Sequence, residues 1–329
     1  MQEQILKYFE KNAKEFQNTI IFDEWEDERI ILAVKKLTQK KILKPLFPVK
    51  SKDLEKLKII LKRNKIKYYS IAIFEDFKDE LIKLLEEIRK DKLKENEAKT
   101  LIEDIHYFST LLLKSNYAQG IVSGSLSPTK DVIKPALQII KTKQGVQKAS
   151  SFFFMVKEKE TFLFADCGFQ INPTPQDIVE ITKLSVESCK KFNYYPRVAL
   201  LSFSTKKSSD DEISQKTRDA YELLLKENVD FEFEGDIQFD AALDKKTREI
   251  KIKDTKLTNN ANIFIFPDLN SGNIGYKIAK ILGDYNAIGP IIQGLNQPVN
   301  DLSRGCSVDE IYYTACITSI IAGKKNENN

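Results

Sequence analysis

The chain has 329 residues, of which 42% are hydrophobic, and 52 basic against 48 acidic side chains give a net charge of +4. This length is enough for two domains of ordinary size, and the apolar fraction is that of a globular protein. Lysine is spread along the chain instead of gathering in one block, so a nucleic-acid-binding surface is not indicated. No apolar run reaches the roughly 20 residues that a transmembrane helix needs, so contact with a membrane is not expected.

Cysteine and histidine usage argues against a metal site. The four cysteines have no paired spacing and there is a single histidine, His106. We therefore expect no disulfide frame and no bound metal, but reduced, buried thiols in a cytoplasmic protein. The N-terminal segment (residues 1–16) lacks the apolar core of a signal peptide, which agrees with that location. No loop motif surrounds His106, so this side chain is expected to cap or pack instead of taking part in catalysis.

Apolar and amphipathic segments alternate from the start of the chain. Strands are predicted at TIIFD (19–23), KPLFPV (44–49), YYSIAIF (68–74) and GIVSG (120–124). Segments between them carry apolar residues at helical spacing, as in DERIILAVKKL and DFKDELIKLLEEIRK. This alternation predicts an α/β fold with mostly parallel sheets flanked by helices.

The pattern changes near residue 145 and again near residue 296. SSFFFMV and TFLFAD flank residues 157–160 like the two strands of a hairpin, and the α/β alternation then resumes. The last helical segment, SVDEIYYTACITSIIAG, is apolar on nearly all sides and is expected to be buried. We therefore predict a first α/β domain from residues 1–145 plus 297–329, and a second α/β domain from residues 146–296.

Loops that follow a strand and precede a helix offer unpaired N–H groups, which favour anions. The first such loop is SGSLSPT, whose glycine allows an unusual backbone angle and whose hydroxyl groups suit a phosphate. An ordinary N-cap and turn explains the same residues, and spacing alone leaves both readings open. The candidate substrate-binding residues in this loop are Ser123, Gly124, Ser125, Ser127 and Thr129.

Two further loops have the same character. SFSTKKSS (202–209) contributes Ser204, Thr205 and Lys206 as candidates, and a solvated cap with surface lysines is the alternative. NQPVNDLSRGCSVDEIYY (296–313) places Ser303 and Arg304 just before a helix that starts near Glu310. A guanidinium group matches phosphate or carboxylate oxygens two at a time, although a capping carboxylate with an Arg304–Asp301 ion pair remains an alternative. No dinucleotide fingerprint, P-loop or nucleophile elbow is present.

Several segments resemble the phosphate acetyltransferase (phosphotransacetylase) family, in order and over nearly the whole chain. They are FDEWEDERIILAVKKL, VSGSLSPT, KPALQIIKT, FADCGFQINPTPQD, PRVALLSFSTK and the long run from ANIFIFPDLN to PVNDLSRGCS. The resemblance implies reversible acetyl transfer between coenzyme A and inorganic phosphate, with acetyl-CoA, phosphate and acetyl phosphate as small-molecule substrates. It also implies two α/β domains with the active site in a cleft, a fold similar to isocitrate and isopropylmalate dehydrogenases, a homodimer, and neither a metal nor a tightly bound cofactor.

The resemblance also assigns roles to individual residues. Ser303 and Arg304 are expected at the acyl phosphate, and Glu310 is expected to take the proton of the coenzyme A thiol. Thiolate then attacks the acyl carbon directly in a ternary complex, so no acyl-enzyme is needed. Arg89 and Lys134 match positions where the family has substrate-binding arginines.

The sequence departs from the family pattern at four positions. Glu310 replaces an aspartate, Lys134 replaces an arginine, Ser127 stands where relatives often have histidine, and Lys207 replaces a glycine. Each change within the predicted site keeps the type of charge, so activity is expected to survive. Two alternatives stay open: a phosphate butyryl- or propionyltransferase, and a non-catalytic relative that acts as a binding protein.

Overall fold

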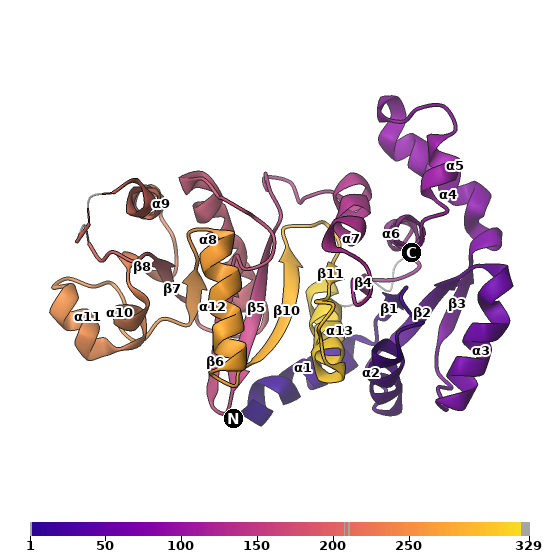
Figure 1. Ribbon diagram of the computed structural model, residues 1–329, viewed down its shortest axis with the longest axis horizontal. Helices are drawn as coiled ribbons and strands as arrows, with labels where there is room; N and C mark the ends of the chain where they lie inside the picture. Colours follow the sequence, from indigo (N-terminus) through magenta and orange to yellow (C-terminus); the bar gives the residue numbers. More distant parts are fainter. Residues whose placement is uncertain (1, 207, 210, 324–329) are drawn as a thin grey trace. The chain divides into compact units, whose positions relative to one another are not determined.

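The computed structural model describes residues 2–206, 208–209 and 211–323, and this part of the chain divides into two compact units. The first unit comprises residues 3–144 and 295–323, and the second comprises residues 145–294 together with Gln2. The first unit is therefore built from two separate stretches of chain. Most of its elements and of those of the second unit are labelled in Figure 1.

The first unit has a sheet of five parallel strands in the order β11-β4-β1-β2-β3. The strands are β1 (Thr19–Phe22), β2 (Lys44–Val49), β3 (Ser70–Ile73), β4 (Gly120–Ser123) and β11 (Val299–Asp301). From β1 the chain passes to β2 and β3 on one side, and it later adds β4 and β11 on the other side. The connections therefore reverse direction between β1 and β4, which makes this point the topological switch of the sheet.

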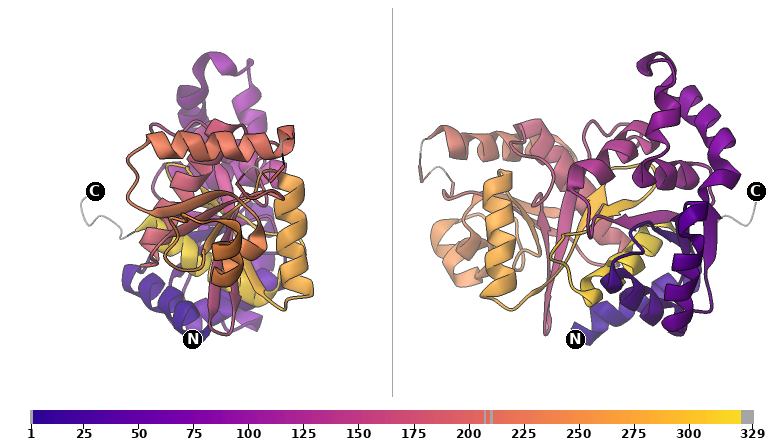
Figure 2. Two further views of the ribbon diagram at one scale, coloured as in Figure 1. Left: turned by 90° about the vertical axis from the view of Figure 1, so that its left-hand side faces the viewer. Right: turned by 45° about the vertical axis from the view of Figure 1, so that its right-hand side comes forward.

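Helices precede, connect and follow these strands, and parallel strands need such crossover connections. They are α1 (Gln2–Phe16), α2 (Glu28–Gln39), α3 (Leu54–Arg63), α4 (Phe74–Arg89), α5 (Glu97–Leu101), α6 (Ile105–Lys114), α7 (Thr129–Pro135) and α13 (Val308–Ala322). Shorter turns are η1 (Ser51–Asp53), η2 (Lys90–Lys92) and the π-helical η3 (Ala136–Ile140). Helix α4 follows β3 without an intervening loop and extends beyond the sheet (Figures 1 and 2).

Helix α13 is buried, as its sequence predicted. It packs against helix α2 and against strands β4 and β1, and the side chains from Ile311 to Ile320 are almost all buried. Its first turn is closed by a capping box, in which Ser307 and Glu310 exchange hydrogen bonds with each other's N–H groups. The last helix therefore fixes the segment that precedes it against the sheet.

The second unit has a six-stranded mixed sheet in the order β10-β5-β6-β9-β7-β8. Its strands are β5 (Ser150–Lys157), β6 (Glu160–Ala165), β7 (Arg197–Leu201), β8 (Glu232–Ile237), β9 (Ile263–Ile265) and β10 (Asn286–Gln293). Its helices are α8 (Pro175–Lys191), α9 (Glu212–Lys226), α10 (Phe239–Leu243), α11 (Lys245–Lys251) and α12 (Leu269–Ile281).

The predicted hairpin is confirmed, because β5 and β6 pair antiparallel with Lys157 opposite Glu160. Strand β10 also pairs antiparallel with β5, whereas β6, β9, β7 and β8 pair in parallel. The α/β fold class predicted from the sequence is thus confirmed in both units. Within the described residues, no helix is long and apolar enough to cross a membrane.

Candidate active site

The candidate residues of the first unit gather at the carboxyl edge of its sheet. Asp23 and Glu24 directly follow β1, the loop 123–129 follows β4, and the turn 303–306 follows β11. Because β1, β4 and β11 are neighbours and run parallel, these loops leave the sheet at the same edge. Ligands of open α/β sheets bind outside the carboxyl ends of the strands at the topological switch, so this edge is the candidate active site.

Gly124 is required where β4 ends. Its φ is +87°, and a Cβ at this position would lie 2.0 Å from an Oδ1 atom of Asp301. The N–H of Leu302 donates to the carbonyl of Ser123 at 2.7 Å, which keeps the two chain segments in close contact. A side chain at residue 124 would therefore separate the loop after β4 from the turn after β11.

The N–H groups of the loop 123–129 converge on an anion, but the anion belongs to the protein. The Glu24 carboxylate accepts hydrogen bonds from the N–H groups of Ser125, Leu126 and Ser127, and from the Ser125 hydroxyl at 2.9 Å. Successive N–H groups in a turn form a nest that attracts a negative charge. The anion cradle predicted from the sequence thus exists, and in this structure a buried carboxylate fills it instead of a phosphate.

His106 lies between two of these loops. Its Nδ1 is 3.1 Å from an oxygen of Asp23 and its Nε2 is 2.9 Å from the hydroxyl oxygen of Ser127. The expected capping role is wrong, because Asp104 caps helix α6 by accepting from the N–H groups of His106 and Tyr107. The expected packing role is correct in that the imidazole is buried, but its neighbours are polar.

Arg29 ties the two loops together. Its guanidinium donates to the carbonyl oxygens of Arg304 at 2.8 Å, Cys306 at 2.9 Å and Ser125 at 2.9 Å. Asp27 holds the guanidinium by two hydrogen bonds from Nε and one from Nη2. Burial opposes the charge of Asp27, but the hydrogen bonds from Arg29 keep the pKa of Asp27 below its ordinary value. Arg29 therefore fixes the backbone of the turn that carries Ser303 and Arg304.

The three residues predicted to be catalytic occupy this turn and the helix after it. The Arg304 side chain is exposed and, among the described residues, has no hydrogen-bond or ion-pair partner, so the alternative Arg304–Asp301 pair is not formed. Ser303 is half-buried, and its hydroxyl oxygen accepts a hydrogen bond from the Gly305 N–H at 3.3 Å. Glu310 is buried and accepts from the Ser307 N–H at 3.1 Å, so its carboxylate caps α13. The capping alternative is thus correct for Glu310, and it does not preclude a second role.

The two predicted substrate-binding cations of the first unit lie away from these contacts. Arg89 ends α4, where its Nη2 reaches the Lys92 carbonyl at 3.5 Å and its charge acts on Tyr107. Its Nε is buried and has no hydrogen-bond partner in the described chain. Lys134 is exposed in the last turn of α7. No contact described for either residue reaches the turn 303–306.

The second predicted anion loop is held internally. Ser204 and Thr205 bond to Ser208, and the Thr205 hydroxyl also bonds to Gln238. The Nζ of Lys206 lies 2.6 Å from Glu234.

This lysine is also 2.9 Å from the Gly235 carbonyl and 3.9 Å from the centre of the Tyr221 ring. The arrangement has a physical reason, because the Glu234 carboxylate is fully buried and needs a compensating cation. The structure therefore gives Lys206 a structural contact, and its contact with substrate stays a prediction. Lys207, the neighbouring departure from the family pattern, lies outside the described residues.

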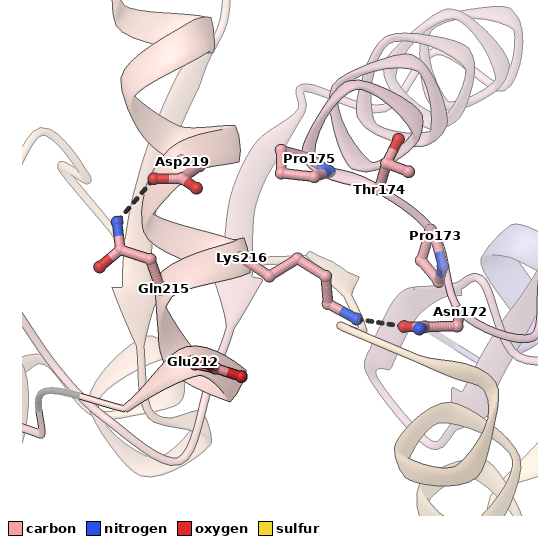
Figure 3. A pocket seen from close by; sticks show the side chains of 8 residues that line it. All are labelled: Asn172, Pro173, Thr174, Pro175, Glu212, Gln215, Lys216 and Asp219. Carbon is pink, nitrogen blue, oxygen red and sulfur yellow. Dashed lines mark hydrogen bonds between the residues drawn. The ribbon is translucent and has the colours of Figure 1, made fainter.

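Two cavities lie elsewhere. In the second unit a hollow of about 390 Å³ lies between the start of α8 and helix α9, where Lys216 donates to Asn172 at 2.7 Å (Figure 3). In the first unit a cavity of about 520 Å³ is lined by Gln17, Lys41 and Lys67, next to the amino ends of β1, β2 and β3. None of the residues predicted from the sequence lines either cavity.

Sequence reasoning missed Glu24, Arg29 and the polar role of His106. A signal for two of them was available, since DEWEDER directly follows the first predicted strand and therefore leaves the sheet at its carboxyl edge. For His106 the signal was indirect, because Ser127 stands where relatives often have histidine and the chain has one histidine elsewhere. Its placement beside Ser127 depends on the packing of α6 and could not be read from spacing.

The comparisons with known proteins agree over nine-tenths or more of the chain. The family model described as "Phosphate acetyl/butaryl transferase" matches residues 4–319. A curated phosphate acetyltransferase from Bacillus subtilis is 43% identical over 307 residues, which cover 91% of this chain and 93% of the relative. The crystal structure of a phosphotransacetylase from Streptococcus pyogenes has a TM-score of 0.88 at 39% identity, with 97% of this chain and 98% of that chain covered.

A more distant match concerns the fold alone. The structure of a putative 4-hydroxythreonine-4-phosphate dehydrogenase from Salmonella typhimurium has a TM-score of 0.52 at 11% identity. This likeness agrees with the predicted resemblance to dehydrogenase folds. Because the family model and the relatives at about two-fifths identity each cover nine-tenths or more of the chain, the chain belongs to the phosphate acetyl/butyryl transferase family.

Proposed function

We propose that this protein is a phosphate acetyltransferase, which interconverts acetyl-CoA and phosphate with acetyl phosphate and coenzyme A. The observation that carries the proposal is the turn 303–306 at the carboxyl edge of the sheet, where Arg29 fixes the backbone and leaves the Arg304 guanidinium exposed. An exposed guanidinium on a rigid turn suits a dianionic phosphoryl group. The acetyltransferase names of the relatives support acetyl as the acyl group.

In the proposed mechanism, Glu310 accepts the proton of the coenzyme A thiol, and the sulfur forms a bond to the acyl carbon of acetyl phosphate. The bond between that carbon and the phosphate oxygen then breaks, and inorganic phosphate leaves. Arg304 balances the charge on the leaving phosphate, while Ser303 donates a hydrogen bond to the developing oxyanion. A thiol has an ordinary pKa near 8.5, so a nearby base raises the fraction of the reactive thiolate.

The substrate-binding roles of Arg89, Lys134 and the loop 123–129 belong to the same proposal. The positive charges of Arg89 and Lys134 would attract the phosphates of coenzyme A before they contact the reacting groups. From the resemblance to the family, we propose that the protein uses coenzyme A as a substrate and needs neither a tightly bound cofactor nor a metal. The four cysteines are free and buried, which supports a cytoplasmic location. We also propose a homodimer formed through the second unit.

The proposal is tested by following coenzyme A release with a thiol reagent. Purified protein should release free coenzyme A from acetyl-CoA only when inorganic phosphate is present, and faster than from butyryl-CoA or propionyl-CoA. Incubation with acetyl phosphate alone should leave the mass of the protein unchanged. A preference for butyryl-CoA would make the protein a butyryltransferase, and an absence of release with every acyl group would make it a non-catalytic relative. Light scattering of the purified chain tests the dimer.

A further inference from the structure

His106 is a buried, polar group that the proposed acyl transfer does not use. It is the single imidazole in the chain, and it lies in the first turn of α6 with 5% of its surface exposed. Its two ring nitrogens face Asp23 at 3.1 Å and the Ser127 hydroxyl at 2.9 Å, and the Ser123 hydroxyl is 3.3 Å from Nδ1. Both nitrogens are therefore engaged with groups of the candidate active site.

The groups around His106 favour its charged form. Asp23 and Glu24 face it from the segment after β1, Asp104 from the start of α6, and Asp301 from β11. Burial works against a charge on the ring, but the hydrogen bond and the charge of Asp23, with smaller contributions from Asp104 and Glu24, raise the pKa of His106 to about 9. At neutral pH both ring nitrogens then carry protons, and both are donors.

A doubly protonated ring fixes the direction of the Ser127 hydroxyl. The ring donates its Nε2–H to the Ser127 oxygen, so the hydroxyl proton must point away from the ring. The Ser127 N–H is already bound to Glu24, and the side chain is half-buried. The hydroxyl proton is therefore directed toward an acceptor outside this network.

The distances resemble those of a Ser-His-Asp triad, but two observations oppose nucleophilic catalysis by Ser127. A general base must have a free lone pair on Nε2, and a charged ring has none. The N–H groups of Ser125, Leu126 and Ser127, which would be the donors for an oxyanion, bind the Glu24 carboxylate. The arrangement therefore supplies a donor and a positive charge instead of a nucleophile.

We propose that His106 is a positioning residue, which Asp23 holds in its charged form and which orients the Ser127 hydroxyl to donate to a phosphoryl oxygen of the substrate. Its charge also offsets the carboxylates of Asp23, Glu24 and Asp301, which lie beside a site that must admit anions. The ligand class is a phosphate monoanion or dianion, either as free inorganic phosphate or as acyl phosphate. This inference rests on the proposed function for the identity of the substrate, but the charge and the contacts of the ring are independent of turnover.

Nuclear magnetic resonance of the tag-free, full-length protein tests the charge directly, because a single histidine gives a single set of imidazole nitrogen signals. We expect both nitrogens to be protonated at pH 7, and we expect inorganic phosphate at concentrations up to 100 mM to shift the Nε2 signal. A neutral ring at pH 7, or signals that do not change over this phosphate range, would overturn the inference. This measurement needs no catalysis, so it remains decisive even if the wild-type protein releases no coenzyme A and the proposed function fails.

Kinetics of His106→Gln, Ser127→Ala and the double variant test the route of the effect. Each single variant should raise KM for phosphate about tenfold, the loss expected for one charge-assisted hydrogen bond, and should change kcat little. The double variant should be no worse than Ser127→Ala, because His106 acts through that hydroxyl. Additive losses, or a fall in kcat with KM unchanged, would contradict the inference.

Two controls separate positioning from folding. Ser109→Ala removes a buried hydroxyl of the same helix that has no partner in the described chain, and it should leave KM for phosphate unchanged. In the wild-type protein KM for phosphate should rise above about pH 9, where the ring loses its charge, whereas His106→Gln should not show this rise.

A separate experiment tests for covalent catalysis. If mass spectrometry found acylated Ser127 after incubation with acetyl phosphate, Ser127 would be a nucleophile and the inference would be overturned.

Discussion

The carboxylate of Glu24 accepts hydrogen bonds from both the N–H and the hydroxyl of Ser125, across a separation of 101 residues in the chain. This pair joins the segment after β1 to the loop after β4 at the switch of the sheet. The protein thus supplies its own anion to a loop that is shaped to hold one. The position of Ser127 relative to the His106 ring that it faces depends on this internal carboxylate.

Glu24→Gln should destabilise the protein. The N–H groups of residues 125–127 donate to both carboxylate oxygens of Glu24, whereas a glutamine amide has only one acceptor oxygen. Leaving a buried donor without a partner costs about 1–3 kcal/mol, so we expect a loss of roughly 2 kcal/mol in the free energy of unfolding. Urea denaturation measures it. Glu26→Gln is the matched control, since Glu26 is exposed and pairs with Lys56 on the surface, where such pairs contribute about 0–1 kcal/mol. Equal stability of the two variants would show that the Glu24 contacts contribute little.

Arg29→Lys should lower kcat/KM by on the order of 10²-fold, because an ammonium group cannot reach three carbonyl oxygens and Asp27 together, and the turn 303–306 then shifts. Steady-state kinetics test this. Guanidinium at millimolar concentration should restore part of the activity of Arg29→Ala. Lys36→Met, in the same helix, removes only an exposed ion pair with Asp309 and should keep nearly full activity. Full activity of Arg29→Lys would remove the positioning role.

Glu310→Gln separates the helix cap from the proposed base. Glutamine is accepted at this position of a capping box, so the free energy of unfolding should change little. The loss of a general base should lower kcat by about 10²–10⁴-fold. Asp309→Asn is the control, because Asp309 is exposed and next in sequence but does not cap the helix. Near-normal turnover of Glu310→Gln would exclude Glu310 as the base.

Asp301 should make stability depend on pH. Its side chain is buried, and burial, with the nearby charge of Glu24, raises the pKa of Asp301 to about 7, although a hydrogen bond from Thr129 and the charge of His106 oppose the rise. In the unfolded chain the pKa is about 3.9, so the folded state binds more protons between these values. The contribution of Asp301 to stability is therefore full below about pH 4 and is lost as pH rises to about 7.

Asp301→Asn removes this dependence. Relative to the wild type, the variant should gain up to about 4 kcal/mol in the free energy of unfolding between pH 4 and pH 8, with most of the change below pH 7. Urea titrations at several pH values measure the difference. A difference that stays constant over this range would show that Asp301 ionises in the folded protein as it does in the unfolded chain.

Most of the fold could be predicted because most of its strands are short apolar runs between polar breaks. The segments 19–23 and 44–49 became β1 and β2, and the hairpin was recognised from its two aromatic strands. Strand β8 (Glu232–Ile237) was not predicted, because its sequence EFEGDI places a carboxylate, Glu234, at a fully buried position. Strand β11 has three residues and forms only because the chain returns to the edge of β4.

The candidate site was predicted in its loops but not in their partners. Ser123, Ser127 and the segment around Ser303 were proposed because each loop follows a strand and precedes a helix, where unpaired N–H groups favour anions. The N–H groups of residues 125–127 bind the side chain of Glu24, which comes from the segment after β1. Nothing near Ser125 in the sequence indicates this partner. The ion pair between Lys206 and Glu234 could not be predicted, because Glu234 lies on a strand that the pattern did not reveal.

The insertion of residues 145–294 between the two stretches of the first unit has a consequence for synthesis on the ribosome. Domains fold as units while the chain is made, from the N-terminal end. The second unit is continuous and can fold as soon as it emerges, whereas the first unit must wait with the edge of β4 open until β11 and α13 follow. The turn 303–306 therefore leaves the ribosome only after the whole stretch 145–294 has been made.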